Sequence, residues 1–84
     1  MSEQELPTAD RILLMMHNLG IVREEKSQII DELANLTNMP SDQLVKFLRG
    51  HEDSGYVKSI TDEVGLVSYF LTGKGIIRVS SALT

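Results

Sequence analysis

The sequence predicts an α+β fold that is mainly helical: three helices, then a β-hairpin, then a short C-terminal segment. Three apolar stripes at helical spacing precede residue 54, and two runs rich in β-branched and aromatic residues follow it. The chain has 84 residues, 42% hydrophobic content and a net charge of −4, which is typical of a soluble globular domain. A domain this short buries only roughly 60 to 65% of its unfolded surface, so a second subunit would add stability.

The first helix is predicted over residues 9–19. Residues 1–7 are polar and are expected to form a flexible tail, which leaves residues 8–84 as a single domain. Thr8 is a candidate N-cap, and Gly20 lies where a C-terminal cap belongs. The helical stripe comprises Ala9, Ile12, Leu13, Met16 and Leu19. Ile21 and Val22 then form either a very short strand or a buried connection.

Two further helices are predicted on either side of a tight turn. The second covers residues 27–37, with a stripe of Ile29, Ile30, Leu33 and Leu36. Residues 38–40 form the turn, because Pro40 disfavours a helical residue before it. Ser41 is expected to cap the third helix, which ends before Gly55 and keeps Leu44, Phe47, Leu48 and His51 on one face.

The hairpin is predicted from Tyr56, Val57 and Ile60 on one strand and residues 66–71 on the other, joined by a turn at residues 61–65. Thr72 is a candidate cap for a closing helix. The stripe of that helix would comprise Ile76, Val79, Ala82 and Leu83. A third strand is the alternative, because Gly73, Gly75 and the β-branched residues after them weaken helix propensity.

Particular segments resemble the winged helix-turn-helix regulators of the MarR-like and PadR-like type. Residues 29–40 are similar to the second helix and turn of such proteins, with the small Ala34 where the helices cross. Residues 53–57 resemble the exit from the recognition helix into the wing, and residues 69–75 resemble the tyrosine, leucine, threonine, lysine and glycine pattern that closes it. The resemblance covers about residues 9–80 and implies a winged-helix fold.

This resemblance implies a transcriptional regulator that binds double-stranded DNA, with residues 41–53 in the major groove. A cytoplasmic location is expected because the sequence has no cysteine and no membrane-spanning run. A homodimer is expected, because the short first helix and the apolar C-terminal segment leave a stripe to cover. The resemblance also places Asp42 and Val45 facing the major groove, but they are not among the predicted DNA contacts. The predicted DNA-binding residues are Ser41, Gln43, Lys46, Arg49, Lys58, Lys74 and Arg78.

The charge distribution leaves an alternative function open. Residues 1–40 hold three basic and seven acidic residues, a net charge of −4, whereas residues 41–84 hold five of each. DNA binding usually needs a basic surplus, yet Asp42 and the turn residues Asp62 and Glu63 are acidic. The alternative is a winged-helix module that binds a protein partner within a transcription or chromatin assembly. Lys46 and Arg49 are then either DNA contacts or members of a solvated, ion-paired helix face.

Other classes of function lack a signature in the sequence. The chain has no cysteine, and no apolar run approaches the roughly 20 residues of a membrane span. His17 and His51 lack the spacing of metal ligands, and Gly73-Lys74-Gly75 lacks the rest of a phosphate-binding loop. His51 is therefore expected to be a packed histidine. No nucleophile motif is present, so neither an enzyme nor a cofactor is predicted.

Overall fold

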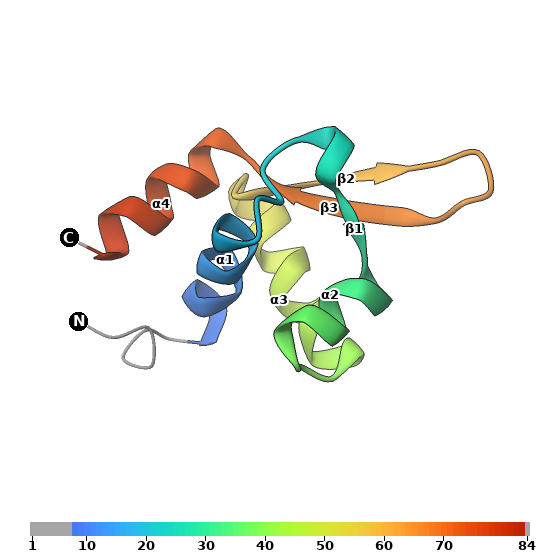
Figure 1. Ribbon diagram of the computed structural model, residues 1–84, viewed down its shortest axis with the longest axis horizontal. Coiled ribbons are helices and arrows are strands. Elements are labelled where there is room, and N and C mark those ends of the chain that lie inside the picture. The colour runs from blue at the N-terminus through green and yellow to red at the C-terminus, as the bar shows by residue number, and fades with distance from the viewer. Residues whose placement is uncertain (1–7, 84) are drawn as a thin grey trace.

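The computed structural model describes residues 8–83 and, of those, the side chains of residues 8–81 (Figure 1). The predicted tail at residues 1–7 and the predicted contacts of Ala82 and Leu83 lie outside this range. The elements in chain order are α1 (Thr8–Asn18), the short 3-10 helix η2 (Glu24–Lys26), β1 (Gln28–Ile29), α2 (Ile30–Thr37), α3 (Ser41–Ser54), β2 (Val57–Thr61), β3 (Val67–Leu71) and α4 (Gly73–Leu83). Three helices, the hairpin and the closing helix thus follow in the predicted order.

The sheet has the antiparallel strand order β1-β3-β2. The predicted hairpin is confirmed, with Val57 opposite Leu71 and Thr61 opposite Val67. On its other edge, β3 pairs with β1, where Gln28 lies opposite Tyr69. The Leu71 amide donates to the carbonyl of Ile21 over 2.8 Å, and Ile21 is only 3% exposed. Residues 21–22 are therefore a buried connection rather than a strand.

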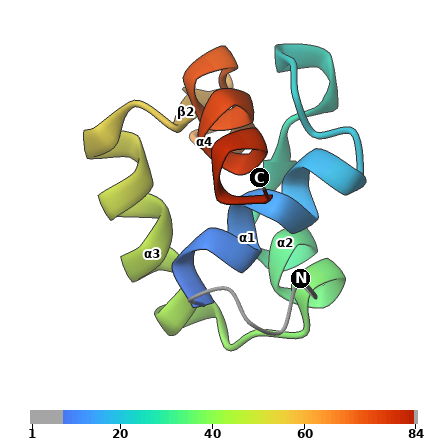
Figure 2. The same ribbon diagram turned by 90° about the vertical axis from the view of Figure 1, so that its left-hand side faces the viewer.

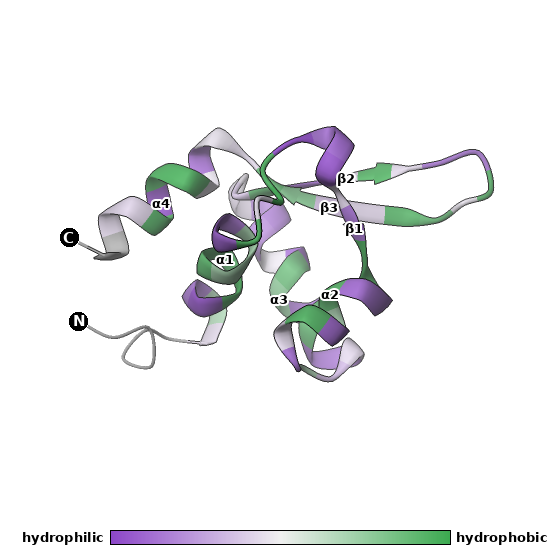
Figure 3. Cartoon of the chain, in the orientation of Figure 1, coloured by the Kyte–Doolittle hydropathy of each residue, from purple (hydrophilic) through white to green (hydrophobic). Residues whose placement is uncertain are grey.

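The core lies where α1, α2 and α3 meet the base of the hairpin. Its fully buried side chains are apolar and come from α1, α2, α3, β2 and β3, namely Ile12, Leu13, Met16, Leu33, Leu44, Leu48, Val57 and Leu71. Figure 3 shows hydrophilic residues over η2 and along part of the hairpin turn, away from this core. The hairpin extends beyond the helices, while α4 packs against α1.

The second helix is shorter than predicted. Gln28 and Ile29 pair with β3 as β1, so the helix begins at Ile30 rather than at residue 27. Because the buried stripe then runs through Leu33 and Thr37, Leu36 is 44% exposed instead of buried. Leu19 is likewise 50% exposed, because α1 ends at Asn18 and Gly20 (φ +75°) turns the chain away.

The turn between α2 and α3 is confirmed, but its cap differs from the prediction. Asn38 takes the left-handed conformation, and its amide donates to the carbonyl of Ala34. Pro40 is the N-cap residue of α3, and no side chain caps the helix. Ser41 is thus the first helical residue and not the cap, since the extended backbone of Pro40 already ends the turn.

The C-terminal segment is a helix, so the alternative of a third strand is wrong. Thr72 caps it as predicted, because its Oγ1 accepts from the Gly75 amide over 3.1 Å. A Cβ at position 75 would overlap the Tyr56 carbonyl oxygen and the Leu71 side chain, so only glycine allows α4 to start this close to β2 and β3.

No helix in the part of the chain that the structure describes is long and apolar enough to cross a membrane.

Candidate nucleic-acid interface

Helix α3 lies at the outer edge of the molecule (Figure 2). Its inner side is held by Leu44 and Leu48, which are 0% exposed, and by His51, which is 8% exposed. The opposite side carries exposed side chains at the spacing of one helix face, and these belong to Asp42, Lys46, Arg49 and Asp53. The arrangement leaves one face of α3 open to a partner along its length.

The two cations on this face are free of carboxylate partners within residues 8–83. Neither Lys46 nor Arg49 takes part in an ion pair there; the ion pair that forms among these residues joins Arg78 to Asp10. The ion-paired alternative for Lys46 and Arg49 is therefore not what the described structure shows. Asp42 and Asp53 lie at the two ends of the same face, so its formal charge is balanced.

The flank of α3 that faces α1 and α4 gathers further cations. Lys46 and Arg78 line a hollow of about 430 Å³ together with Gly50 and Tyr56. The Arg78 guanidinium carbon lies 6.0 Å from the centre of the Tyr56 ring, and Lys74 Nζ lies 5.6 Å from the same ring. Two predicted DNA contacts from α4 thus lie beside one aromatic side chain, and one of them, Arg78, shares the hollow with Lys46 of α3.

Arg78 is fixed in place by the first helix. Its Nε donates to Asp10 Oδ1 over 3.2 Å, and a second nitrogen donates to Oδ2 over 3.3 Å. The Arg78 side chain keeps 46% of its surface exposed. This bidentate pair lowers the net charge of the hollow but leaves the guanidinium accessible.

His51 is the packed histidine that the sequence predicts. Its Nε2 lies 2.8 Å from the Ala9 carbonyl, which requires that nitrogen to carry the proton and donate. Burial lowers the pKa of His51 below its ordinary value of 6.5, and the charge of Arg78 acts in the same direction. The hydrogen bond to Ala9 and the carboxylate of Asp10 oppose this shift in pKa.

The flank of α3 that faces the hairpin is different. Ser59 Oγ on β2 donates to Glu52 Oε2 on α3, so this face of the strand is turned to the helix. Successive side chains of a strand point to opposite faces, so Lys58 lies on the other face, opposite Phe70. The structure does not bring Lys58 together with the cations of α3.

The hairpin turn is acidic for a structural reason. The Asp62 carboxylate accepts from the amides of Val64 and Leu66, each over 2.9 Å, and so closes the turn. At the tip, Val64 is 80% exposed and Leu66 is 51% exposed. The tip therefore presents apolar and acidic groups rather than cations.

The remaining predicted contacts lie apart from the hollow. Ser41 is exposed at the start of α3, Val45 is half-buried, and Gln43 is exposed beside a second cavity between α3 and α1. The sequence did not identify Tyr56 or Asp10 as part of the site. An aromatic residue directly after the helix-ending Gly55 was the available signal for Tyr56, but its neighbours depend on how α4 packs.

No group of three or more His, Cys, Asp or Glu side chains suited to a metal ion is found among the described residues.

No family model matches the chain, and no curated protein matches it closely. Two solved structures do match. The DNA-binding TubR fragment from Clostridium botulinum has a TM-score of 0.78 at 20% identity, over 89% of this chain and 93% of that one.

The second match is a cysteine-to-serine mutant of Lactococcus lactis ZitR, with a TM-score of 0.65 at 15% identity over 99% of this chain. The chain spans about half of ZitR, since 54% of that structure is covered. Similarity at these identities concerns the fold. Together with the helix order and the hairpin, it shows that this chain has a winged-helix fold.

Proposed function

We propose that this winged-helix chain is a DNA-binding transcriptional regulator whose α3 enters the major groove. The observation that carries the proposal is the open outer face of α3, where Lys46 and Arg49 are exposed and have no carboxylate partner within residues 8–83. Phosphate neutralisation by such cations supplies much of the affinity of DNA-binding proteins. The similarity in fold to a DNA-binding fragment of TubR supports the same function.

Each predicted contact takes a role that suits its position. Gln43 pairs with adenine, and Lys46 and Arg49 reach guanine or a phosphate. Ser41 joins the start of α3 in holding a phosphate. Lys74 and Arg78, beside Tyr56, contact the DNA backbone on the α4 flank. Lys58 contacts the DNA backbone from the outer face of the wing.

We further propose that the regulator is a cytoplasmic homodimer of the MarR-like or PadR-like type. Ile77 on α4 is 67% exposed, and α4 packs on α1 at the side of the molecule away from the hairpin (Figure 1). A second copy would cover this apolar side chain. Analytical ultracentrifugation at high micromolar concentration tests the dimer, because a mass near 9.4 kDa would contradict it.

The test of DNA binding is a salt titration. Fluorescence anisotropy of a labelled random duplex is measured between about 50 and 200 mM salt, where a binder with several phosphate contacts loses affinity steeply. Lys46→Ala and Arg49→Ala should each weaken binding and reduce the slope of log K against log salt by about 1. Lys26→Ala is the matched control, because Lys26 is exposed in η2 and lies outside the proposed interface.

A second candidate function is a protein-interaction module. It is favoured by the hairpin tip, where the exposed Val64 and Leu66 stand beside Asp62 and Glu63. Acidic and apolar groups suit a protein surface better than a phosphate backbone. No measurable duplex binding at the lowest salt would favour this function over the first.

A further inference from the structure

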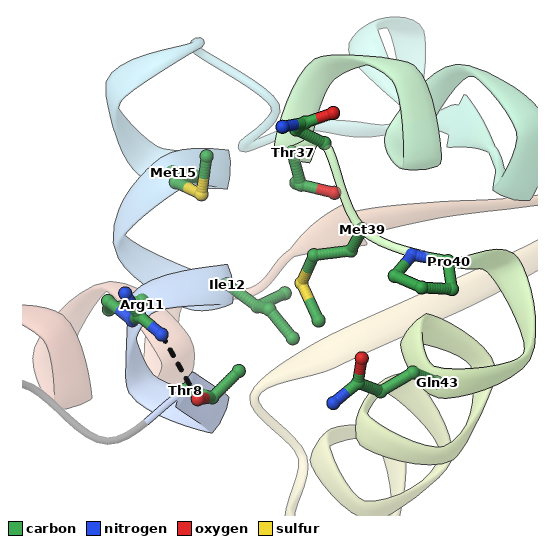
Figure 4. A pocket seen from close by; sticks show the side chains of 9 residues that line it. Thr8, Arg11, Ile12, Met15, Thr37, Met39, Pro40 and Gln43 are labelled. Carbon is green, nitrogen blue, oxygen red and sulfur yellow. Dashed lines mark hydrogen bonds between the residues drawn. The ribbon is translucent and has the colours of Figure 1, made fainter.

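Two concave surfaces flank α3, and they differ in charge. The cavity of about 480 Å³ between α1, the turn at residues 37–40 and α3 has, among the described residues, Arg11 as its one charged lining residue, which Figure 4 shows bonded to Thr8. The hollow of about 430 Å³ between α1, α3 and α4 is lined by two cations, Lys46 and Arg78, and by Asp10, which is paired with Arg78. Because cations hold anions, the hollow is the surface that suits a phosphate group.

The wall that α3 gives to this hollow includes bare backbone at Gly50. Gly50 lies inside α3, where glycine is less favourable than alanine. A Cβ at this position would meet nothing within 4 Å, so packing within the described chain does not require glycine here, as it does at Gly75. The space beside Gly50 is therefore open to a partner, and a glycine allows a ligand to approach the backbone closely.

The opposite wall of the hollow includes Arg78, whose guanidinium is oriented by Asp10. The carboxylate of Asp10 accepts from Nε and from one terminal nitrogen of Arg78, so this pair occupies one edge of the guanidinium. The Asp10 side chain is 14% exposed, whereas the Arg78 side chain is 46% exposed. The other edge of the planar group can donate to a second anion, and phosphate accepts two parallel N–H bonds from such an edge.

The first turn of α1 connects the two walls. The Ala9 carbonyl accepts from Nε2 of His51 on α3 over 2.8 Å, and the next residue, Asp10, holds Arg78 of α4. Because adjacent residues of α1 make these two contacts, they restrict the position of the Arg78 guanidinium relative to α3.

We propose that this hollow binds one phosphate group of the DNA backbone. The phosphate approaches the backbone of α3 over Gly50, accepts from the outer edge of Arg78 and is also reached by Lys46. Asp10 is a positioning residue, because it orients Arg78 without touching the phosphate. The inference rests on the DNA-binding function proposed above, and it adds a defined phosphate site with two residues, Gly50 and Asp10, that are not cations.

The close approach at Gly50 is tested by adding a side chain there. Gly50→Leu would fill the phosphate site and should weaken binding of the labelled random duplex by about fivefold or more at about 50 mM salt. Gly50→Ala should weaken binding by a smaller factor, yet it should raise the melting temperature by roughly 4 to 8 °C, because alanine favours a helix. A variant that is more stable and binds less tightly has not lost affinity through unfolding.

Ser80→Leu is the matched control for added bulk. Ser80 is exposed on α4 and does not line the hollow. Residues two apart on a helix do not face each other, so Ser80 is turned away from Arg78. Ser80→Leu should therefore leave the duplex affinity unchanged. Native affinity in Gly50→Leu, or equal losses in Gly50→Leu and Ser80→Leu, would overturn the phosphate site.

Asp10→Asn separates positioning from charge. The substitution removes a negative charge, so charge alone predicts tighter duplex binding. If Asp10 positions Arg78, binding should instead weaken by about threefold, because an amide has one acceptor oxygen where the carboxylate has two. Asp10→Glu keeps a carboxylate and should recover part of this loss. Asp31→Asn, at an exposed position on α2, is the matched control and should not weaken binding. Tighter binding by Asp10→Asn would contradict the positioning role.

The outcomes separate the phosphate site from the function on which it rests. If Lys46→Ala and Arg49→Ala weaken duplex binding while Gly50→Leu does not, the chain binds DNA without this phosphate site. If the native chain binds no duplex, both proposals are wrong. If Gly50→Leu changes the mass measured by analytical ultracentrifugation from that of the native chain, the hollow contacts a second copy, which would also overturn the phosphate site.

Discussion

The two flanks of α3 differ in what they present to a partner. On the α1 and α4 flank, Lys74 and Arg78 lie beside the Tyr56 ring, and Lys46 lines the same hollow as Arg78. On the hairpin flank, Lys58 lies on the face turned away from α3, and the tip presents Asp62 and Val64. The difference indicates that cationic contacts beside α3 come from α4, whereas the hairpin supplies little positive charge.

The largest effect is expected where α4 meets the hairpin. In Gly75→Ala the new Cβ would overlap the Tyr56 carbonyl and the Leu71 side chain, so the variant should lose about 2 to 3 kcal/mol of unfolding free energy. Urea denaturation measures this loss. In Gly73→Ala nothing lies within 4 Å of the new Cβ, so that variant should be unchanged or stabilised by up to about 1 kcal/mol. Equal stabilities of the two variants would mean that α4 does not depend on this close approach.

The next effect separates the flanks in DNA binding. Lys46→Glu reverses a charge on the open face of α3 and should weaken duplex binding by about tenfold or more at low salt. Lys58→Glu, on the far face of the hairpin, should change the affinity by less than about threefold. Anisotropy titrations compare them. A larger loss for Lys58→Glu would show that the hairpin, not the α4 flank, carries the main backbone contact.

A smaller effect is expected at the hairpin turn. Asp62→Ala removes the acceptor of two backbone amides and should lower the unfolding free energy by about 1 kcal/mol. Glu63→Ala is the neighbouring control, since Glu63 is exposed and should change stability by less than about 0.5 kcal/mol. Thermal unfolding measures both. If the two variants have the same melting temperature, the Asp62 carboxylate does not stabilise the turn, and the acidity of the turn would serve binding instead.

The smallest effect concerns pH. Because burial lowers the pKa of His51 in the folded chain, the unfolded chain binds more protons below pH 6.5. The stability due to neutral His51 is full above pH 6.5 and falls as the pH drops towards the folded-state pKa. The melting temperature of the native chain should therefore decrease more between pH 7.5 and 5.5 than that of His51→Gln. Parallel pH profiles would contradict the lowered pKa.

The elements with strong local signals were predictable. The stripe of Leu44, Leu48 and His51 and the glycine at position 55 placed α3 within its observed bounds. The hairpin followed from two apolar runs around a glycine-containing turn. The two-residue β1 was missed because its existence depends on pairing with β3, which no local pattern reports.

The site was predictable only in part. The exposure of Lys46 and Arg49 followed from the helical period of α3. The meeting of Lys46 with Arg78 did not, because it requires α4 to pack on α1 and Arg78 to pair with Asp10, 68 residues earlier. The cavity between α1 and α3 was not predicted for the same reason, since its walls come from α1, the turn at residues 37–40 and α3.

The junction between α3 and α4 has a consequence for spacing along a duplex. Thr72 Oγ1 donates to the Gly55 carbonyl, and the Thr72 amide donates to that of Tyr56, so the end of α3 and the start of α4 share one hydrogen-bonded unit. These two hydrogen bonds restrict the angle between the helices. In the dimer proposed above, if the copies are joined through α4, the separation of the two α3 helices would then depend on the α4 contact alone, and with it the number of base pairs between half-sites.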